Sequence, residues 1–234
     1  MKRNELPDVL YKNIDVVKPY PLNVEPVKEM INITAFFPGG SGLWSEEKTK
    51  DFPSILVLGQ DFSTVKQYED MLVGKASDLE SPTWRNLIKL FREADLELKE
   101  CYFSNVFMGL RDTVSMVGEF PGFKDKGFVD RNVEFLSFQI ETIKPHVIIT
   151  LGKYTAEMLT YLPGTDLKVW SKWKALREAN NGIKFEAKLN NHTCTCIALE
   201  HPSMRNSNVK RRVYGDYCGH EAEVEMLREI AKER

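Results

Sequence analysis

Short apolar runs and segments with helical periodicity alternate along most of this chain. The predicted strands are the apolar runs 54–58, 101–105, 146–151 and 195–199. The run 146–151 is mostly apolar and is followed by Gly152, as expected for a strand covered on both faces. Asn181-Gly182 and Asn190-Asn191 mark turns around one further strand, 183–189.

The predicted helices carry apolar residues three and four positions apart. They are 82–94, 130–144, 154–162 and a C-terminal segment with Val224, Leu227 and Ile230. Ser81 is placed to cap the first of them, and Lys144-Pro145 ends the second. Because strands and helices alternate from Phe52 onward, we expect a parallel sheet with helices on its faces.

The first fifty residues differ from the rest of the chain. They are rich in proline and glycine, and they include the run Phe37-Pro38-Gly39-Gly40-Ser41-Gly42. We predict that residues 1–50 form an N-terminal extension packed on the domain, and that residues 51–234 form the α/β domain. The glycine run resembles a phosphate cradle only superficially, because no Lys-Ser/Thr pair follows it.

Composition narrows the class of protein. With 234 residues, 42% of them hydrophobic, the chain is long enough for one large core. The net charge of -2 gives no support for a nucleic-acid partner, so local charge has to carry such an argument. No apolar run reaches the roughly 18 residues of a membrane span, and four cysteines do not make a disulfide scaffold. We expect a cytoplasmic protein with no membrane partner.

Three predicted strands end at residues that can do chemistry. Asp61 follows the first strand, Asn105 ends the second, and His201 follows the last. Taken singly, each is more often a turn, a cap or a structural residue. Ligands of open α/β sheets bind beyond the carboxyl ends of the strands, however, and these three residues all stand there. The sequence therefore predicts one site that contains an acid, an amide and an imidazole.

Two further groups of residues leave alternatives open. His192, Cys194 and Cys196 would share one strand face, and with Cys218 and His220 they are a candidate zinc set. Cysteines that pack into the core explain the same pattern, and the paired Cys-x2-Cys spacing of structural zinc sites is absent. The basic residues after the His201 loop are Arg205, Lys210, Arg211 and Arg212. They form either a solvated face or a contact surface for phosphates.

Five short motifs in order resemble the uracil-DNA glycosylase superfamily. They are Gly59-Gln60-Asp61, the proline-started segment 82–90, Phe103-Ser104-Asn105, the segment 144–152, and His201-Pro202-Ser203. The resemblance spans Phe52 to about Gly215. It implies a three-layer α/β/α sandwich with a short, mostly parallel central sheet. It also implies hydrolysis of the N-glycosidic bond of uracil or a related damaged base in DNA.

The resemblance assigns roles to the predicted site. Asp61 would stabilise the oxocarbenium-like sugar and orient water. His201 would donate as a neutral imidazole to the leaving base. Asn105 and the backbone of Gln60 would bind the base, with no metal or organic cofactor. Ser63, Ser203 and Arg205 would contact phosphates of the DNA, Met204 or Arg205 would fill the vacated stack, and Lys210, Arg211 and Arg212 would add charge contacts.

The chain departs from the family pattern at several positions. Phe62-Ser63-Thr64 stands where related motifs continue Pro-Tyr-His, so Ser63 replaces the tyrosine that blocks the methyl group of thymine. Phe62 and Tyr68 are the candidates for stacking on the base. Arg205 stands where the family carries a leucine wedge, and the cysteines of the iron–sulfur branch are absent. Two other hypotheses remain: a catalytically inactive DNA- or nucleotide-binding protein on the same fold, or an unrelated α/β hydrolase. We expect a monomer.

Overall fold

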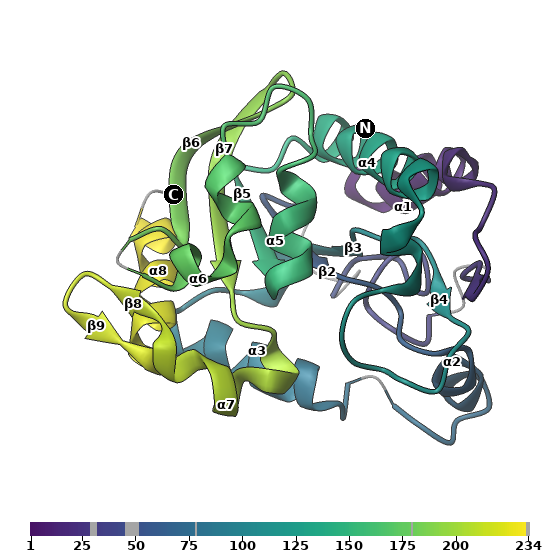
Figure 1. Cartoon of the computed structure of the whole chain (residues 1–234), viewed down its shortest axis with the longest axis horizontal. Coiled ribbons are helices and arrows are strands. Elements are labelled where there is room, and N and C mark those ends of the chain that lie inside the picture. Colours follow the sequence, from purple (N-terminus) through teal and green to yellow (C-terminus); the bar gives the residue numbers. More distant parts are fainter. Residues whose placement is uncertain (29–31, 45–51, 78, 179, 233–234) are drawn as a thin grey trace.

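The computed structural model describes residues 1–28, 32–44, 52–77, 79–178 and 180–232. Its centre is a five-stranded sheet with the strand order β3-β2-β5-β7-β6 (Figure 1). The strands are β2 (Ile55–Gly59), β3 (Cys101–Asn105), β5 (Val147–Leu151), β6 (Ile183–Leu189) and β7 (His192–Leu199). Four of them run parallel, and β6 pairs antiparallel with β7 at one edge.

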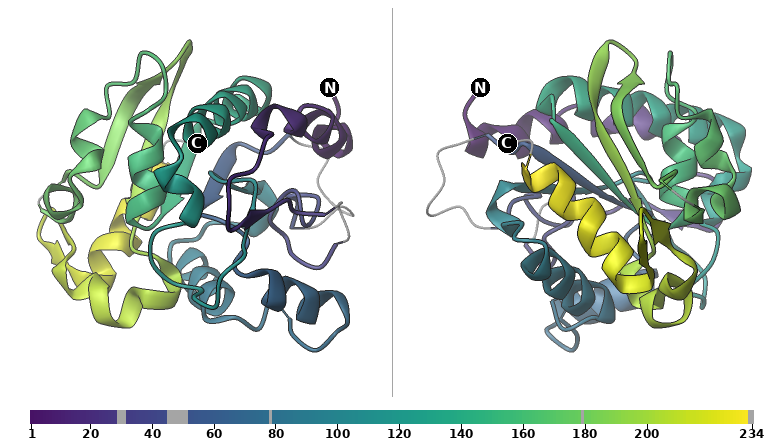
Figure 2. Two further views of the ribbon diagram at one scale, coloured as in Figure 1. Left: turned by 45° about the vertical axis from the view of Figure 1, so that its right-hand side comes forward. Right: turned by 90° about the vertical axis from the view of Figure 1, so that its left-hand side faces the viewer.

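Helices cover both faces of this sheet, which makes the three-layer α/β/α sandwich that the sequence predicts. On one face lie α3 (Pro82–Glu93) and α8 (Gly219–Lys232), and on the other lie α4 (Lys126–Ile143) and α5 (Lys153–Leu159) (Figure 2). The arrangement explains why β2, β3 and β5 are buried at every position. A strand in contact with helices on both sides has no face for water.

The remaining elements are short. The helices are α1 (Leu6–Tyr11), α2 (Val65–Leu72), α6 (Trp173–Arg177) and α7 (Arg205–Asn208), and the two-residue strands are β1 (Val24–Glu25), β4 (Leu110–Arg111), β8 (Val213–Tyr214) and β9 (Tyr217–Cys218). Within the described ranges, no helix has the length and apolar content needed to cross a bilayer.

Local capping explains where the helices begin. Ser81 caps α3 as predicted, with its hydroxyl accepting from the backbone N–H of Trp84 at 3.3 Å. Helix α4 begins four residues earlier than predicted because Asp125 caps it, accepting from Phe128 N at 2.8 Å. Helix α2 was missed by the sequence patterns. It follows Thr64, whose side chain accepts from Gln67 N.

The N-terminal residues include a segment that is part of the domain's structure. Phe37 N donates to Phe103 O at 3.0 Å, and Phe103 N donates to Gly42 O at 2.8 Å. Single bridges pair Phe37 with Ser104 and Leu43 with Tyr102. Residues 33–44 therefore cover the outer edge of β3, where unpaired strand groups would otherwise face solvent.

Candidate active site

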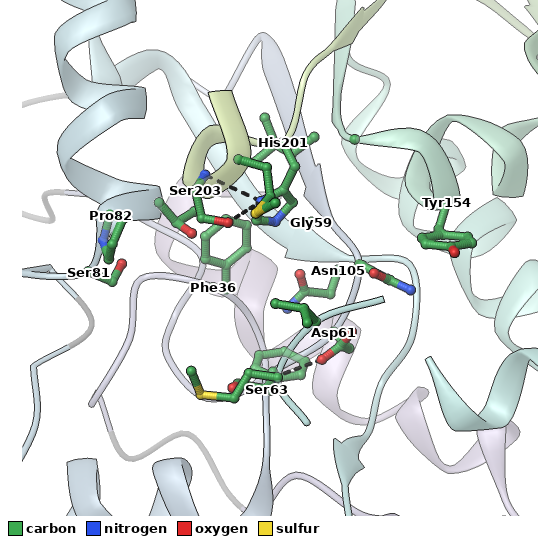
Figure 3. A pocket seen from close by; sticks show the side chains of 18 of the residues that line it. Phe36, Gly59, Asp61, Ser63, Ser81, Pro82, Asn105, Tyr154, His201 and Ser203 are labelled. Atoms are coloured by element: carbon green, nitrogen blue, oxygen red, sulfur yellow. Dashed lines mark hydrogen bonds between the residues drawn. The ribbon is translucent and has the colours of Figure 1, made fainter. Parts of the chain in front are cut away.

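A cavity of about 610 Å³ opens at the carboxyl ends of the parallel strands (Figure 3). Asp61, Asn105 and His201 all line it, so the structure brings together the acid, the amide and the imidazole. Gln60, Phe62, Ser63 and Tyr68 line the same cavity, as do Ser203 and Met204. The volume is typical of pockets that hold small ligands.

Asn105 is held at the tip of β3, in register with Gly59 of β2. A Cβ atom on Gly59 would lie 2.2 Å from Asn105 Oδ1, so only glycine permits the amide to lie there. The side chain of Asn105 is buried and makes no hydrogen bond to another described residue. Its donor and its acceptor are both available to a ligand in the cavity.

His201 follows β7 and packs against Gly152 at the tip of β5. Gly152 has a φ of +94°, and a Cβ there would lie 3.0 Å from the Cβ of His201. The loop is also fixed from α3, because Asn86 Nδ2 donates to Pro202 O at 2.8 Å. The glycine that ends the 144–152 motif thus makes room for the imidazole.

The protonation of His201 follows from its contacts. Its Nδ1 accepts from Ser203 N at 3.3 Å and lies 2.8 Å from the Ser203 hydroxyl. Burial lowers the pKa of His201, and the charge of Arg111 lowers it further while Asp61 raises it. A neutral ring whose Nδ1 is an acceptor carries its proton on Nε2. His201 is therefore a neutral donor.

Asp61 is not a free carboxylate. Arg111 Nε donates to Oδ1 at 3.0 Å and Nη2 donates to Oδ2 at 2.7 Å, which is a bidentate pair. The two side chains are only 3% and 6% exposed. Ser63 N also donates to Oδ1, at 2.8 Å. Oδ1 is thus fully engaged, and Oδ2 keeps one acceptor position unused by described residues.

Among the cavity residues that sequence reasoning missed, Arg111 and Phe36 matter most for the site. Arg111 carried no signal, because its partner lies fifty positions away in the chain. Phe36 lines the cavity, and its ring lies 3.3 Å from the Cβ position of Gly59 and contacts Trp84 and Phe103. It comes from the proline- and glycine-rich segment, where no periodic pattern marks a pocket residue.

The predicted base-binding residues differ in how they are held. Gln60 lines the cavity, and its buried Nε2 has no hydrogen-bond partner in the described part of the chain. Ser63 adopts a left-handed backbone with a φ of +72°, and its hydroxyl donates to Gln67 Oε1 at 2.6 Å. Tyr68 is almost wholly buried, and its hydroxyl donates to Lys28 O at 3.0 Å.

The structure corrects the prediction that Arg205 and Arg212 contact DNA. Both are buried and both pair with Glu223 of α8, which is itself fully buried. Arg212 also donates to Leu176 O at 2.5 Å and to Ala198 O at 2.7 Å. Because these guanidinium groups are used inside the protein, they cannot reach a phosphate. Arg205 likewise cannot act as a wedge.

The other predicted DNA-contacting residues are at the surface. Ser203 and Met204 are exposed at the mouth of the cavity, and the side chain of Met204 is 46% exposed. Lys210 and Arg211 are exposed just beyond α7, and neither makes an ion pair within the described ranges. These four residues remain candidates for contact with DNA.

The candidate zinc residues are dispersed. Cys194 and Cys196 are buried with sulfur atoms 3.8 Å apart, whereas Cys218 is exposed on β9. His192 Nε2 lies 2.7 Å from Pro145 O, and His220 contacts Glu93. In the part of the chain that is described, no three His, Cys, Asp or Glu side chains are grouped to hold a metal ion.

Comparison with models of protein families identifies the family of this chain. A family model described as the uracil DNA glycosylase superfamily matches residues 50–223. The matched segment contains all five motifs and each strand of the central sheet. No curated protein matches the chain.

Proposed function

Because the chain belongs to the uracil-DNA glycosylase superfamily, we propose that it hydrolyses the N-glycosidic bond of uracil or a related damaged base in DNA. The membership itself indicates a DNA glycosylase-type hydrolase and a DNA partner. The observation that supports the finer assignment is the presence of Asp61, Asn105 and a neutral His201 in one cavity.

The acid of the site suits activation of water. Departure of the base leaves an oxocarbenium-like sugar that water must attack. The pair with Arg111 offsets much of the negative charge of Asp61, so bare charge stabilisation is a smaller part of its role. Its unused acceptor position on Oδ2 can hold and orient the attacking water.

The leaving base is stabilised from the other side of the cavity. His201 donates its Nε2 proton to the oxygen on which negative charge develops, in the manner of an oxyanion hole. Asn105 supplies a donor and an acceptor that match the C=O and N–H edge of uracil. The unpaired amide of Gln60 adds a donor. Phe36, Phe62 and Tyr68 are the aromatic side chains that can stack on the base.

A base inside a duplex must leave the stack before it reaches such a cavity. Flipping takes a few kcal/mol, which contacts with the DNA offset. Met204 is the exposed apolar side chain of the His201 loop, and it is suited to fill the gap in the stack. Ser203 on the same loop can contact a phosphate.

The proposal is tested by single-turnover release of free base from oligonucleotides that contain uracil, as single strands and in duplexes. A matched control is the double variant Asp61→Asn with Arg111→Met, which removes the acid but leaves no unpaired charge. Release of uracil by the wild type, with no release by the double variant, supports the proposal. Binding of DNA with no release of any damaged base would reject it.

Lys210 and Arg211 give a prediction about affinity. Replacing both with alanine should weaken binding to all DNA sequences alike and reduce the log–log salt slope by about 1–2 units, because each neutralised phosphate contributes nearly one unit. The measurement is a titration of labelled duplex at several salt concentrations.

The control for that titration is Lys12→Ala with Lys99→Ala. Lys12 is exposed just after α1, which lies on the other side of the molecule from α7 (Figure 1). Lys99 is half-buried and precedes β3, at the amino ends of the parallel strands and opposite the cavity. We expect their slope to match the wild type. A slope that is unchanged in the Lys210 and Arg211 variant would place that surface away from DNA.

Ser63 gives a prediction about specificity. A serine leaves room beside the fifth carbon of a pyrimidine, so 5-hydroxymethyluracil should be excised within about 10- to 200-fold of the uracil rate, the difference expected of a small apolar contact. Ser63→Tyr should increase the ratio of the uracil rate to the 5-hydroxymethyluracil rate, whereas Ser63→Gly should not. The ratio is the correct measure, because a bulky residue at a φ of +72° strains the backbone and slows both reactions.

That prediction has a clear failing result. If the wild type removes uracil but no 5-substituted base, and Ser63→Tyr leaves the ratio unchanged, Ser63 does not contact that part of the base.

The ion pair between Asp61 and Arg111 supports a second candidate function. A carboxylate paired on both oxygens with a buried arginine is a weaker electrostatic catalyst than a free one. A protein that binds DNA or nucleotides without excision would tolerate such a pair. The single-turnover assay separates the two candidates, since only the glycosylase releases base.

A further inference from the structure

Arg111 stands where two parts of the site meet. It ends β4, and its backbone N–H donates to Ser63 O at 2.8 Å. A single bridge also pairs it with Thr64. The backbone of Arg111 is therefore fixed to the loop that carries Asp61 before its side chain makes any contact.

The guanidinium group of Arg111 has every N–H engaged. Nε and one N–H of Nη2 bind the two oxygens of Asp61. The other N–H of Nη2 donates to Gly118 O at 3.0 Å, and Nη1 donates to Val117 O and Glu119 O, both at 3.3 Å. The group also lies over the ring of Phe120, 5.7 Å from its centre. Five donors meet five acceptors, which fixes the orientation of the guanidinium plane.

The carbonyl groups that it binds belong to a loop at the mouth of the cavity. We call residues 112–119 the rim loop. Its apolar side chains are exposed, with Val114 fully exposed, Met116 at 56% and Val117 at 66%. Met116, Val117 and Gly118 line the cavity. Three large apolar groups in four residues are unusual for a surface loop, and they match the apolar wedges that enter DNA.

We propose that Arg111 is a positioning residue, which holds Asp61 in its reactive orientation and ties that orientation to the seating of the rim loop on DNA. The inference rests on the function proposed above. Contact of the rim loop with DNA and alignment of the carboxylate are then one event, because the same rigid group holds both. Loss of the link misaligns the water that Asp61 orients.

Lysine cannot replace this arginine. An ammonium group retains the charge but has three donors in place of five and lacks the planar fork. Arg111→Lys should therefore lower the single-turnover excision rate about 10²-fold, which is the usual effect of a small misplacement at a reacting centre. The loss should persist at saturating DNA, because it concerns alignment and not only affinity.

The matched control is Arg131→Lys. Arg131 also binds backbone carbonyl groups, those of Val17 and Pro19, and it lies over the ring of Phe128. None of these three contact residues of Arg131 lines the cavity. We expect Arg131→Lys to excise at the wild-type rate. Equal rates for Arg111→Lys and Arg131→Lys would overturn the proposal.

Two readouts do not depend on excision. The rim loop of Arg111→Lys should be cut by thermolysin at least about tenfold faster than that of the wild type, since local opening exposes cleavage sites. Arg111→Met should raise the pKa of His201, measured by NMR of its imidazole, because it removes a neighbouring cation. Both effects are expected even if the wild type releases no base. A protein that releases no base but shows both effects would contradict the proposed function and not the coupling of Asp61 to the rim loop through Arg111.

Protection of the rim loop from thermolysin by duplex DNA completes the test. The proposal predicts protection in the wild type and less in Arg111→Lys. A loop that DNA leaves unprotected in both proteins, or that is cut equally in both without DNA, would overturn the proposal. Thermal unfolding is recorded for each variant. In the double variant Asp61→Asn with Arg111→Met both charges are removed, and its rim loop should also be cut faster than that of the wild type.

Discussion

Asp61→Asn should lower the single-turnover rate of excision by about 10³-fold or more while affinity for DNA is retained. In the proposed mechanism the carboxylate acts on the developing cation and on the attacking water, and a negative charge adds nothing attractive toward phosphates. Comparison of excision rates with gel-shift affinities measures both effects. An Asp61→Asn rate within about threefold of the wild type, which is under ~1 kcal/mol of barrier, would contradict the assignment of Asp61.

That experiment requires the double variant described above. In Asp61→Asn the guanidinium of Arg111 loses its partner while only 3% exposed, and breaking a buried pair destabilises a protein by about 3–5 kcal/mol. Asp61→Asn with Arg111→Met leaves no buried charge. If both proteins are folded and both fail to excise, the loss belongs to the acid and not to instability.

His201→Ala should lower the chemical rate by about 10²–10³-fold, the usual loss for one oxyanion donor. The loss should be smaller for 5-fluorouracil, because a better leaving anion depends less on the donor. Single-turnover rates on the two bases measure this difference. Equal losses on both bases would indicate that His201 has a structural role only.

The stability of the protein should also report on His201. Its pKa is lowered in the folded protein, chiefly by burial, relative to an ordinary value near 6.5. Above that value the imidazole is neutral in both the folded and unfolded states and adds no dependence on pH. As pH falls below about 6.5, the unfolded state takes up the proton first and stability declines. His201→Ala should flatten this part of the curve in urea unfolding between pH 7 and 5.

The parts of the site that the sequence could predict are those set by local pattern. The parallel strands β2, β3, β5 and β7 are recognisable in the sequence as largely apolar, buried runs. Their carboxyl ends meet at one edge of the sheet. Asp61, Asn105 and His201 therefore meet in one cavity for a reason that can be read along the chain. The helix cap at Ser81 was predictable for a similar reason, because a cap depends on the next few residues only.

The missed features depend on partners that are distant in sequence. A run of basic residues after His201 resembles a surface, yet Arg205 and Arg212 are buried because one acid of α8, Glu223, is placed beneath them. No local pattern distinguishes an arginine that meets water from one that meets a buried carboxylate. Arg111 and Phe36 were overlooked for the same reason, since each gains its role from a residue in another element.

The segment 33–44 changes what counts as the smallest working unit of this protein. The family match begins at residue 50, and a fragment cut there would retain every recognised motif. It would nevertheless lack Phe36, one wall of the cavity, and it would uncover the outer edge of β3. An uncovered edge strand pairs readily with other chains. The family match thus begins later in the chain than the segment needed to complete the cavity and cover β3. A minimal fragment should begin ahead of residue 33.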